Sequence, residues 1–214
     1  MTEWTRSSEE TSWRLTVGFV ALCLFIWNWI FINVPELHDF ALVYDIVLLV
    51  AMIIGGLGYA SVYPFGVLAF PLLKEILEPT LTGVVVGLGW VVVGGQIARL
   101  SGFSIYQQLP VAVAFLFGFV VACTEEMLFR ATVLPSLVRL LKSPTVGVIV
   151  TSLMFCTLHW TAFQASLPLL VSSFLFSIII SVLTLHYRTA WVAGVAHATY
   201  NLIAIYSLIG LPFP

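Results

Sequence analysis

Charge is scarce in this chain: Asp, Glu, Lys and Arg make up 8% of its 214 residues, against about a quarter in an ordinary soluble domain. The net charge is close to zero and no basic stripe is present, so nucleic acid is not an expected partner. Cysteine is also rare. Cys23, Cys123 and Cys156 lie in apolar runs without paired spacing, which argues against a disulfide framework or a zinc knuckle.

Long apolar runs stand in place of charge. Hydrophobic residues make up 61% of the chain, and they gather in runs of roughly twenty, the length that crosses a bilayer as a helix. The pattern predicts an all-α polytopic membrane protein with about seven transmembrane helices. The predicted spans are 15–33, 41–60, 80–98, 110–134, 145–163, 167–186 and 190–209. We therefore expect a polar N-terminal tail over residues 1–13 and a single helical membrane domain over residues 14–214.

Segment 61–79 is the least regular part of this division. It is apolar, but it contains Pro64 and Pro71 and ends in the charged stretch 74–78. We interpret it as an interfacial or re-entrant piece, because proline interrupts helices and charge is costly inside a bilayer. If this segment crosses the membrane instead, the chain has about eight transmembrane helices and the N-terminus changes sides.

Basic residues outside the apolar spans gather on one side of the predicted membrane. With the N-terminus in the cytoplasm, Arg99 alone falls on the outside. The basic residues on the inside are then Arg6, Arg14, Lys74, Arg139, Lys142 and Arg188. This positive-inside bias predicts a cytoplasmic N-terminus.

Local signals support individual helices. Ser143 can cap the fifth span, with Pro144 at its first position. Gly83 and Gly87 lie four apart in the third span, which favours close helix packing. The sixth span carries a face of serines, and we interpret these as packing residues as well. They are Ser173, Ser177 and Ser181.

Ionisable and amide side chains inside the later spans are expensive there and indicate a functional site. They are Glu125, Glu126 and Arg130 in the fourth span, His159 in the fifth, and His197 and Asn201 in the seventh. Counted at about 1.5 Å per residue from the cytoplasmic ends of upright helices, they lie about 10 to 21 Å deep. Three separate spans thus deliver polar groups to one layer, which predicts an active site between helices at mid-membrane depth.

Spacing within the fourth span assigns different roles to its two carboxylates. Glu126 and Arg130 are four apart and share a helix face, so they can form an ion pair. Glu125 points about 100° away around the helix and does not share that partner. Glu125 is therefore the candidate general base.

The other polar groups complete a hydrolytic site. We expect His159 to help Glu125 take a proton from a water that attacks a carbonyl, with Phe155 packing against the His159 ring. His197 and Asn201 share a helix face and can donate to the oxyanion that develops. No serine or cysteine is obviously paired with a base, so a nucleophilic mechanism is disfavoured.

Alternatives remain open at this stage. Two histidines, two glutamates and an asparagine can bind Zn²⁺, although the sequence lacks HExxH. Our first expectation is no cofactor, and a zinc-dependent membrane protease is one alternative. A non-proteolytic proton- or ion-coupled transporter, or an immunity or scaffold protein, is another, because buried carboxylates and histidines also mark transport pathways. A purely structural polar network that ties three helices together is a further alternative, which the convergence of six polar groups disfavours.

These residues resemble the motifs of the CPBP family of intramembrane proteases, which is named for CAAX proteases and bacteriocin-processing enzymes and is also called Abi. The family pattern EExxxR is matched by Glu125, Glu126 and Arg130, FxxxH by Phe155 and His159, and HxxxN by His197 and Asn201. The three motifs occur in the family's order, each on its own span, within residues 110–209.

The resemblance implies an all-helical membrane endopeptidase without a catalytic metal. By analogy Glu125 and His159 activate the water, the HxxxN pair forms the oxyanion hole, and the rest of EExxxR supports the site. Eukaryotic relatives remove the last three residues of prenylated CAAX proteins, whereas prokaryotic relatives are more varied. We accordingly expect a membrane-embedded or lipidated protein or peptide as substrate, and the plasma membrane of a prokaryote as the location.

Overall fold

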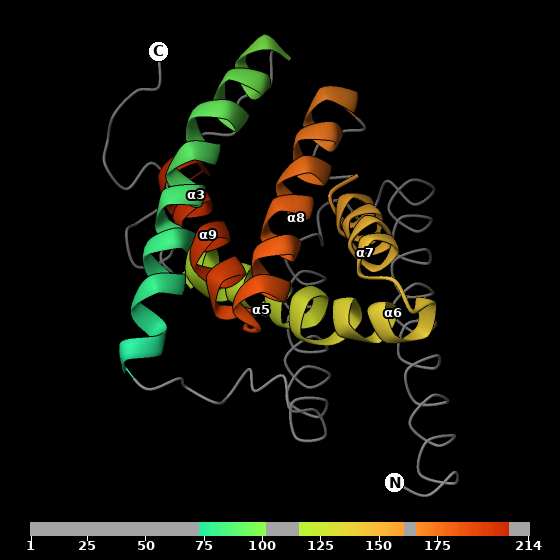
Figure 1. Cartoon of the computed structure of the whole chain (residues 1–214). Coiled ribbons are helices and arrows are strands. Elements are labelled where there is room, and N and C mark those ends of the chain that lie inside the picture. The colour runs from blue at the N-terminus through green and yellow to red at the C-terminus, as the bar shows by residue number, and fades with distance from the viewer. Residues whose placement is uncertain (1–72, 102–115, 161–165, 206–214) are drawn as a thin grey trace, which may run out of the picture.

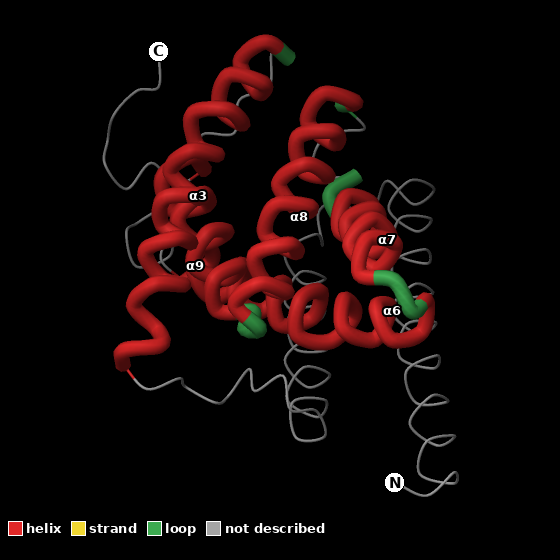
Figure 2. The backbone as a smooth tube through the Cα atoms, in the orientation of Figure 1, coloured by secondary structure: helices red, strands yellow, loops and turns green. Residues whose placement is uncertain are grey.

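The computed structural model describes residues 73–101, 116–160 and 166–205, and every regular element within these ranges is a helix (Figures 1 and 2). The all-helical class is therefore confirmed for the described part of the chain. Several predictions fall outside the described residues, including the side of the membrane on which the N-terminus lies. They are the predictions for residues 1–13, 15–33, 41–60, 61–72, 110–115, 161–163 and 206–209.

Two of the described helices are long and apolar enough to cross a membrane. They are the stretch Ile76–Leu100 of α3 (Leu73–Leu100) and the whole of α8 (Leu167–Tyr187). α8 matches the predicted sixth span to within one residue. The expected total of seven or eight spans remains a prediction, because much of the chain lies outside the described residues.

α3 begins seven residues before the predicted start of the third span at residue 80. Residues 73–79 are thus its first turns and do not belong to a separate interfacial piece. The prediction assigned residues 61–79 to that piece because of Pro64, Pro71 and the charged stretch 74–78. Here Pro79 lies buried in the second turn, where it removes one backbone hydrogen bond from a helix of 28 residues. The hydroxyl of Thr80 donates to the Ile76 carbonyl at 2.7 Å in the same turn.

α3 packs against α9 (Trp191–Tyr200) through its glycines. A Cβ atom added at Gly83 would lie 2.8 Å from the Val192 carbonyl oxygen, and one at Gly87 would lie 2.6 Å from the Ala196 carbonyl oxygen. No real side chain tolerates such distances, so the two backbones approach each other only because glycine has no side chain. The predicted close packing face is confirmed.

The segment that carries EExxxR is one helical run with alternating hydrogen-bond registers. It consists of η2 (Leu116–Val121), α5 (Ala122–Glu126), η3 (Met127–Val133) and α6 (Leu134–Leu141), where η marks a π-helix. Pro135 is the second residue of α6, two residues after the end of η3, and the wider π-turn before it accommodates a residue that has no N–H to donate. π-turns inside α-helices are frequent at functional sites. The run ends at residue 141, seven residues later than predicted.

α6 does not stand parallel to the membrane-length helices. In Figure 1, α3 and α8 run lengthwise while α6 runs across the view, and Figure 2 shows the same crossing. The depth estimate for Glu125 counted residues along an upright fourth span. That count does not hold for residues 134–141, because they do not rise along the direction of α8.

α7 (Pro144–Leu158) begins as the sequence indicates and ends sooner. The Ser143 side chain accepts a hydrogen bond from the Val146 N–H at 3.3 Å, which confirms the predicted cap. The helix was predicted to reach residue 163. It stops at Leu158 instead, so His159 is its C-cap residue with φ −89° and ψ 2°. His159 therefore lies at the end of α7 and not in the middle of a helix.

Two apolar clusters flank the place where the motifs meet. The first joins η3 and α6 to α7 through Phe129, Val133, Leu137 and Phe155. The second joins α8 to α9 through Phe176, Ile180, Ala193 and Ala196. The His197 ring lies between them, with ring centroids 5.7 Å from Phe155 and 5.9 Å from Phe176.

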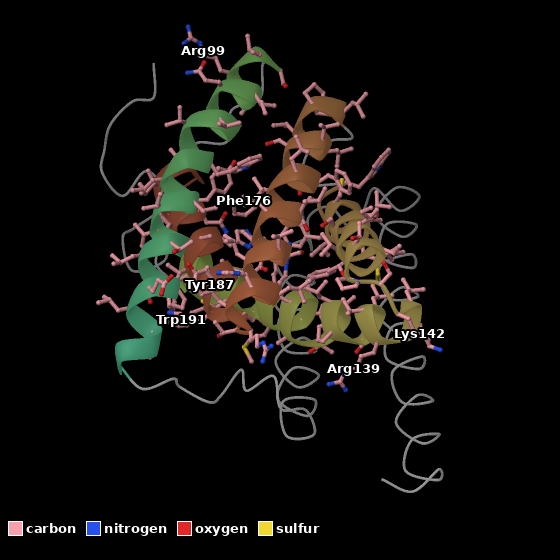
Figure 3. All side chains as sticks on the ribbon, viewed as in Figure 1. Arg99, Arg139, Lys142, Phe176, Tyr187 and Trp191 are labelled. Atoms are coloured by element: carbon pink, nitrogen blue, oxygen red, sulfur yellow. The ribbon has the colours of Figure 1, made fainter. Side chains whose placement is uncertain are left out.

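Three basic side chains outside the EExxxR motif lie towards the ends of the described bundle. Figure 3 places Arg99 at one end and Arg139 and Lys142 near the other. This separation agrees with the sequence-based assignment of Arg99 alone to the outside. The orientation itself stays a prediction.

Candidate active site

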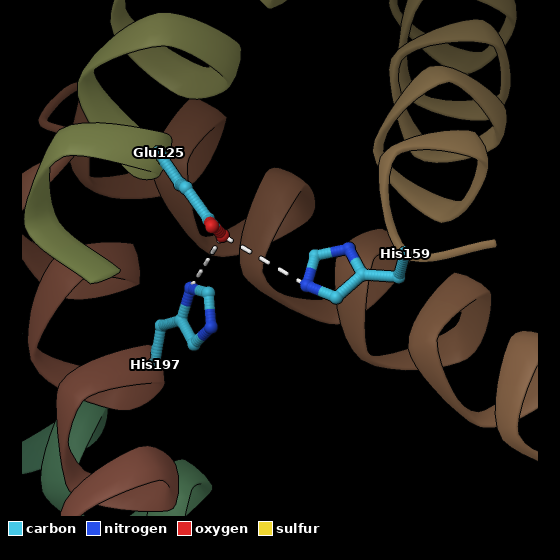
Figure 4. A group of neighbouring side chains, drawn as sticks. All are labelled: Glu125, His159 and His197. Atoms are coloured by element: carbon cyan, nitrogen blue, oxygen red, sulfur yellow. Dashed lines mark ion pairs between the residues drawn. The ribbon is translucent and has the colours of Figure 1, made fainter. Parts of the chain in front are cut away.

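Glu125, His159 and His197 come together from three elements (Figure 4). Glu125 lies on α5, His159 caps α7, and His197 lies on α9. Glu125 Oε2 is 3.9 Å from His159 Nε2 and 3.9 Å from His197 Nδ1. The structure thus unites groups that the sequence placed on separate spans, and their chemical roles remain predictions.

The backbone fixes the protonation of His159. Its Nδ1 is 3.0 Å from the Phe155 carbonyl oxygen, and a carbonyl only accepts, so Nδ1 carries the proton in the neutral ring. Nε2 then presents a lone pair on the side of Glu125. The Phe155 ring supports the imidazole, with centroids 4.6 Å apart. The expected packing of Phe155 against His159 is confirmed, and the carbonyl bond adds a second restraint.

Glu126 and Arg130 form the predicted ion pair, with Arg130 Nη1 at 2.8 Å from Glu126 Oε2. Both side chains are about 1% exposed. The other carboxylate oxygen of Glu126, Oε1, lies 2.8 Å from His197 Nδ1. Because a carboxylate accepts hydrogen bonds, Nδ1 of His197 must carry a proton. The sequence did not indicate this second bond of Glu126.

Arg130 is held by two further groups. Its guanidinium lies over the Phe155 ring at 4.4 Å from the centroid, a cation–π distance. Its Nη2 donates to the Ser177 hydroxyl on α8 at 2.6 Å. Phe155 therefore supports both Arg130 and His159. From the sequence, Ser177 was interpreted as a helix-packing residue. The serine face of the sixth span was the one feature that could have indicated another role.

Asn201 is the first residue of η4 (Asn201–Ile205), one turn after His197, and it is 8% exposed. His197 is 4% exposed. Both predicted oxyanion donors are therefore buried on the same helical stretch. Since Nδ1 of His197 is bound to Glu126, Nε2 is the nitrogen through which this ring can act on a substrate. A donor at Nε2 requires the doubly protonated imidazolium. Because Glu126 is already paired with Arg130, the Glu125 carboxylate, 3.9 Å from Nδ1, is the group that can balance this charge.

The same cluster has the donor types that bind metal. One ligand atom from each of Glu125, His159 and His197 lies within 4.8 Å of the others. A tetrahedral zinc with bonds of about 2.05 Å holds its ligands about 3.3 Å apart, so these groups would have to move closer. In addition, His197 Nδ1, the nitrogen at 3.9 Å from Glu125, is already bonded to Glu126. The residues fit zinc in chemistry but not in their present spacing.

The cysteines of the described part do not contribute to this cluster chemically. The Cys156 thiol donates to the Leu170 carbonyl on α8 at 3.2 Å. Cys123 packs beside Gly194 on α9, where an added Cβ would lie 3.4 Å from its sulfur. These contacts agree with the interpretation of both as small packing residues.

Comparison with known proteins supports the same part of the chain. Residues 107–203 match the family model described as type II CAAX prenyl endopeptidase Rce1-like. The comparisons with curated proteins and with solved structures gave no match. The matched range holds all three motifs, which confirms the resemblance to CAAX proteases of the CPBP family. Over residues 107–203, the part that carries the candidate site, this chain is therefore similar to the Rce1-like type II CAAX prenyl endopeptidases.

Proposed function

We propose that this protein is an intramembrane endopeptidase that hydrolyses a peptide bond by a water activated between Glu125 and His159. The Rce1-like domain supports a peptidase of the CAAX-protease type. The two membrane-length apolar helices support an integral membrane protein. The observation that carries the proposed mechanism is the meeting of Glu125 with two histidines from distant elements.

The geometry suits one water between base and histidine. Glu125 Oε2 and His159 Nε2 are 3.9 Å apart, too far for a direct hydrogen bond. Two hydrogen bonds of about 2.8 Å each span that distance easily. Such a water would be able to donate one proton to Glu125 while His159 Nε2 accepts from the other. Its lone pair would then face the substrate carbonyl.

The reaction balances without a cofactor. The water oxygen forms a bond to the carbonyl carbon, and its proton goes to Glu125. The carbonyl oxygen becomes an oxyanion, for which His197 Nε2–H and the Asn201 amide are the proposed donors. The C–N bond then breaks, and the proton returns from Glu125 to the leaving amine. Glu126, Arg130 and Phe155 hold the two histidines in place.

The substrate we propose is a membrane-associated or lipidated protein or peptide. A site among apolar helices is reached by hydrophobic tails, and the family description names prenylated CAAX substrates. We place the enzyme in the plasma membrane of a prokaryote with its N-terminus in the cytoplasm. The basis for that orientation is the basic side chains on one side of the predicted spans.

A zinc-dependent peptidase is the second candidate, because Glu125, His159 and His197 form a metal-compatible group. In that case the metal would activate the water, and the same three residues would hold it. We propose the metal-free mechanism, because the donor atoms are spaced more widely than zinc binds them and because Glu126 already engages His197.

The test is cleavage of a farnesylated peptide with a Cys-aliphatic-aliphatic-X tail by the purified protein in nanodiscs. Wild-type protein should cleave it in EDTA, and Glu125→Gln should not. Glu78→Gln, a carboxylate bonded to Tyr187 away from the cluster, is the control and should remain active. Activity lost in EDTA and restored by zinc would establish the metal enzyme. An active Glu125→Gln would overturn the assignment of the base.

A further inference from the structure

Ser177 on α8 binds the buried arginine of the EExxxR motif. Its hydroxyl accepts from Arg130 Nη2 at 2.6 Å, and its carbonyl oxygen lies 3.4 Å from the same nitrogen. The side chain of Ser177 is fully buried. A helix outside the three motifs therefore fixes the far side of the guanidinium.

Ser177 is linked to His197 through Arg130 and Glu126, and each of these two side chains uses one atom for each neighbour. Arg130 uses Nη2 for Ser177 and Nη1 for Glu126. Glu126 in turn uses Oε2 for Arg130 and Oε1 for His197 Nδ1. Because each group is held at two different atoms, rotation of one planar group turns the next, so the orientation of His197 depends on that of Arg130.

We infer that Ser177 is a positioning residue that fixes the orientation of His197, and keeps its proton on Nδ1, by holding Arg130 and through it Glu126. This inference rests on the proposed hydrolysis for its catalytic consequence. With the hydroxyl removed, Nη2 keeps only the 3.4 Å carbonyl contact, and the guanidinium loses the stronger of its two restraints from α8. Glu126 Oε1 then no longer holds His197 Nδ1 at one angle, and Nε2 is presented poorly to the substrate.

The same helix face provides a matched control. Ser181 lies one turn further along α8 and is as completely buried as Ser177. Among the described residues its hydroxyl has no hydrogen-bond partner. Ser177→Ala and Ser181→Ala therefore delete the same atom at the same burial, but only the first removes a contact to Arg130.

In the peptidase assay with the farnesylated peptide, Ser177→Ala should lower kcat about tenfold with KM unchanged, the loss expected for one hydrogen bond to a charged group. Ser177→Thr keeps the hydroxyl and should restore most of kcat. Ser181→Ala should match the wild type. A purely structural role for Ser177 would instead lower the amount of folded enzyme and leave kcat per folded molecule unchanged.

A second readout needs no substrate: the Nδ1–H proton resonance of His197, followed by NMR in nanodiscs with labelled histidine. Wild type and Ser181→Ala should show a sharp downfield resonance, and Ser177→Ala should broaden or lose it. If wild type cleaves nothing but the resonance responds as described, the positioning holds and the proposed function fails. If Ser177→Ala keeps both the resonance and kcat, the inference is wrong.

Discussion

Replacing Arg130 with alanine is the perturbation whose effect follows most directly from the buried contacts. Arg130 is about 1% exposed. The change removes the ion pair with Glu126 at 2.8 Å, the hydrogen bond to Ser177 at 2.6 Å and the cation–π contact with Phe155. What remains is a buried Glu126 carboxylate with His197 as its hydrogen-bond partner.

The expected loss is large. Breaking a buried ion pair by deleting one partner costs about 3–5 kcal/mol, because the other charge is left uncompensated. That is a considerable part of the roughly 5–15 kcal/mol by which a typical protein is stable. The double variant Glu126→Gln/Arg130→Met leaves no charge stranded, and the amide oxygen of the introduced glutamine can still accept from His197 Nδ1. It should therefore lose less stability than Arg130→Ala alone.

Unfolding in mixed micelles, followed by tryptophan fluorescence, measures these differences. Lys142→Ala is the control, since Lys142 is exposed at the end of α6, and it should change the free energy of unfolding by no more than about 0.5 kcal/mol. The reasoning fails if Arg130→Ala is as stable as Lys142→Ala. It also fails if the double variant is less stable than the single one, because the cost would then not come from the stranded Glu126.

Three further predictions concern single side chains. If Asn201 donates to the oxyanion, Asn201→Ala should lower kcat about 10²- to 10³-fold while KM stays similar. A decrease in kcat of less than about tenfold in steady-state kinetics would contradict this role. His159→Ala should abolish cleavage without unfolding the protein, whereas His186→Ala, at the exposed end of α8, should remain active in the same assay. Gly87→Ala should destabilise the protein by about 1–3 kcal/mol, because its Cβ would lie 2.6 Å from the Ala196 carbonyl oxygen; Gly89→Ala, with nothing within 4 Å, is the control and should be neutral in thermal unfolding.

The site could be assembled from the sequence to a considerable extent, because helix geometry is simple. Residues four apart share a face, so the Glu126–Arg130 pair and the packing of Phe155 against His159 were both predicted and both confirmed. The energetic cost of placing polar groups in apolar surroundings identified the other candidate site residues. In a chain with 8% charged residues, polar groups within apolar runs are few enough to be considered together.

Other features left no trace in the sequence. A π-turn has no hydrophobic period of its own, so η2 and η3 were expected to be ordinary helix. The fifth span was expected to reach residue 163, although the helix ends at Leu158 with His159 as its C-cap residue. The bond between Glu126 and His197 and the bond between Arg130 and Ser177 join residues 71 and 47 positions apart. Only the crossing of the helices determines such pairs, and residue spacing cannot reveal them.

Whether Glu125 activates the water that cleaves membrane proteins can be measured by mass spectrometry of membrane-protein termini in the native host. The comparison is between wild type, a deletion strain, and the deletion complemented with Glu125→Gln. If Glu125 is the base, a set of protein termini should disappear in the deletion, and wild-type protein should restore this set whereas the Gln variant should not. Complete restoration by Glu125→Gln would contradict this role of Glu125 and would favour a transporter, immunity or scaffold role for the same buried cluster.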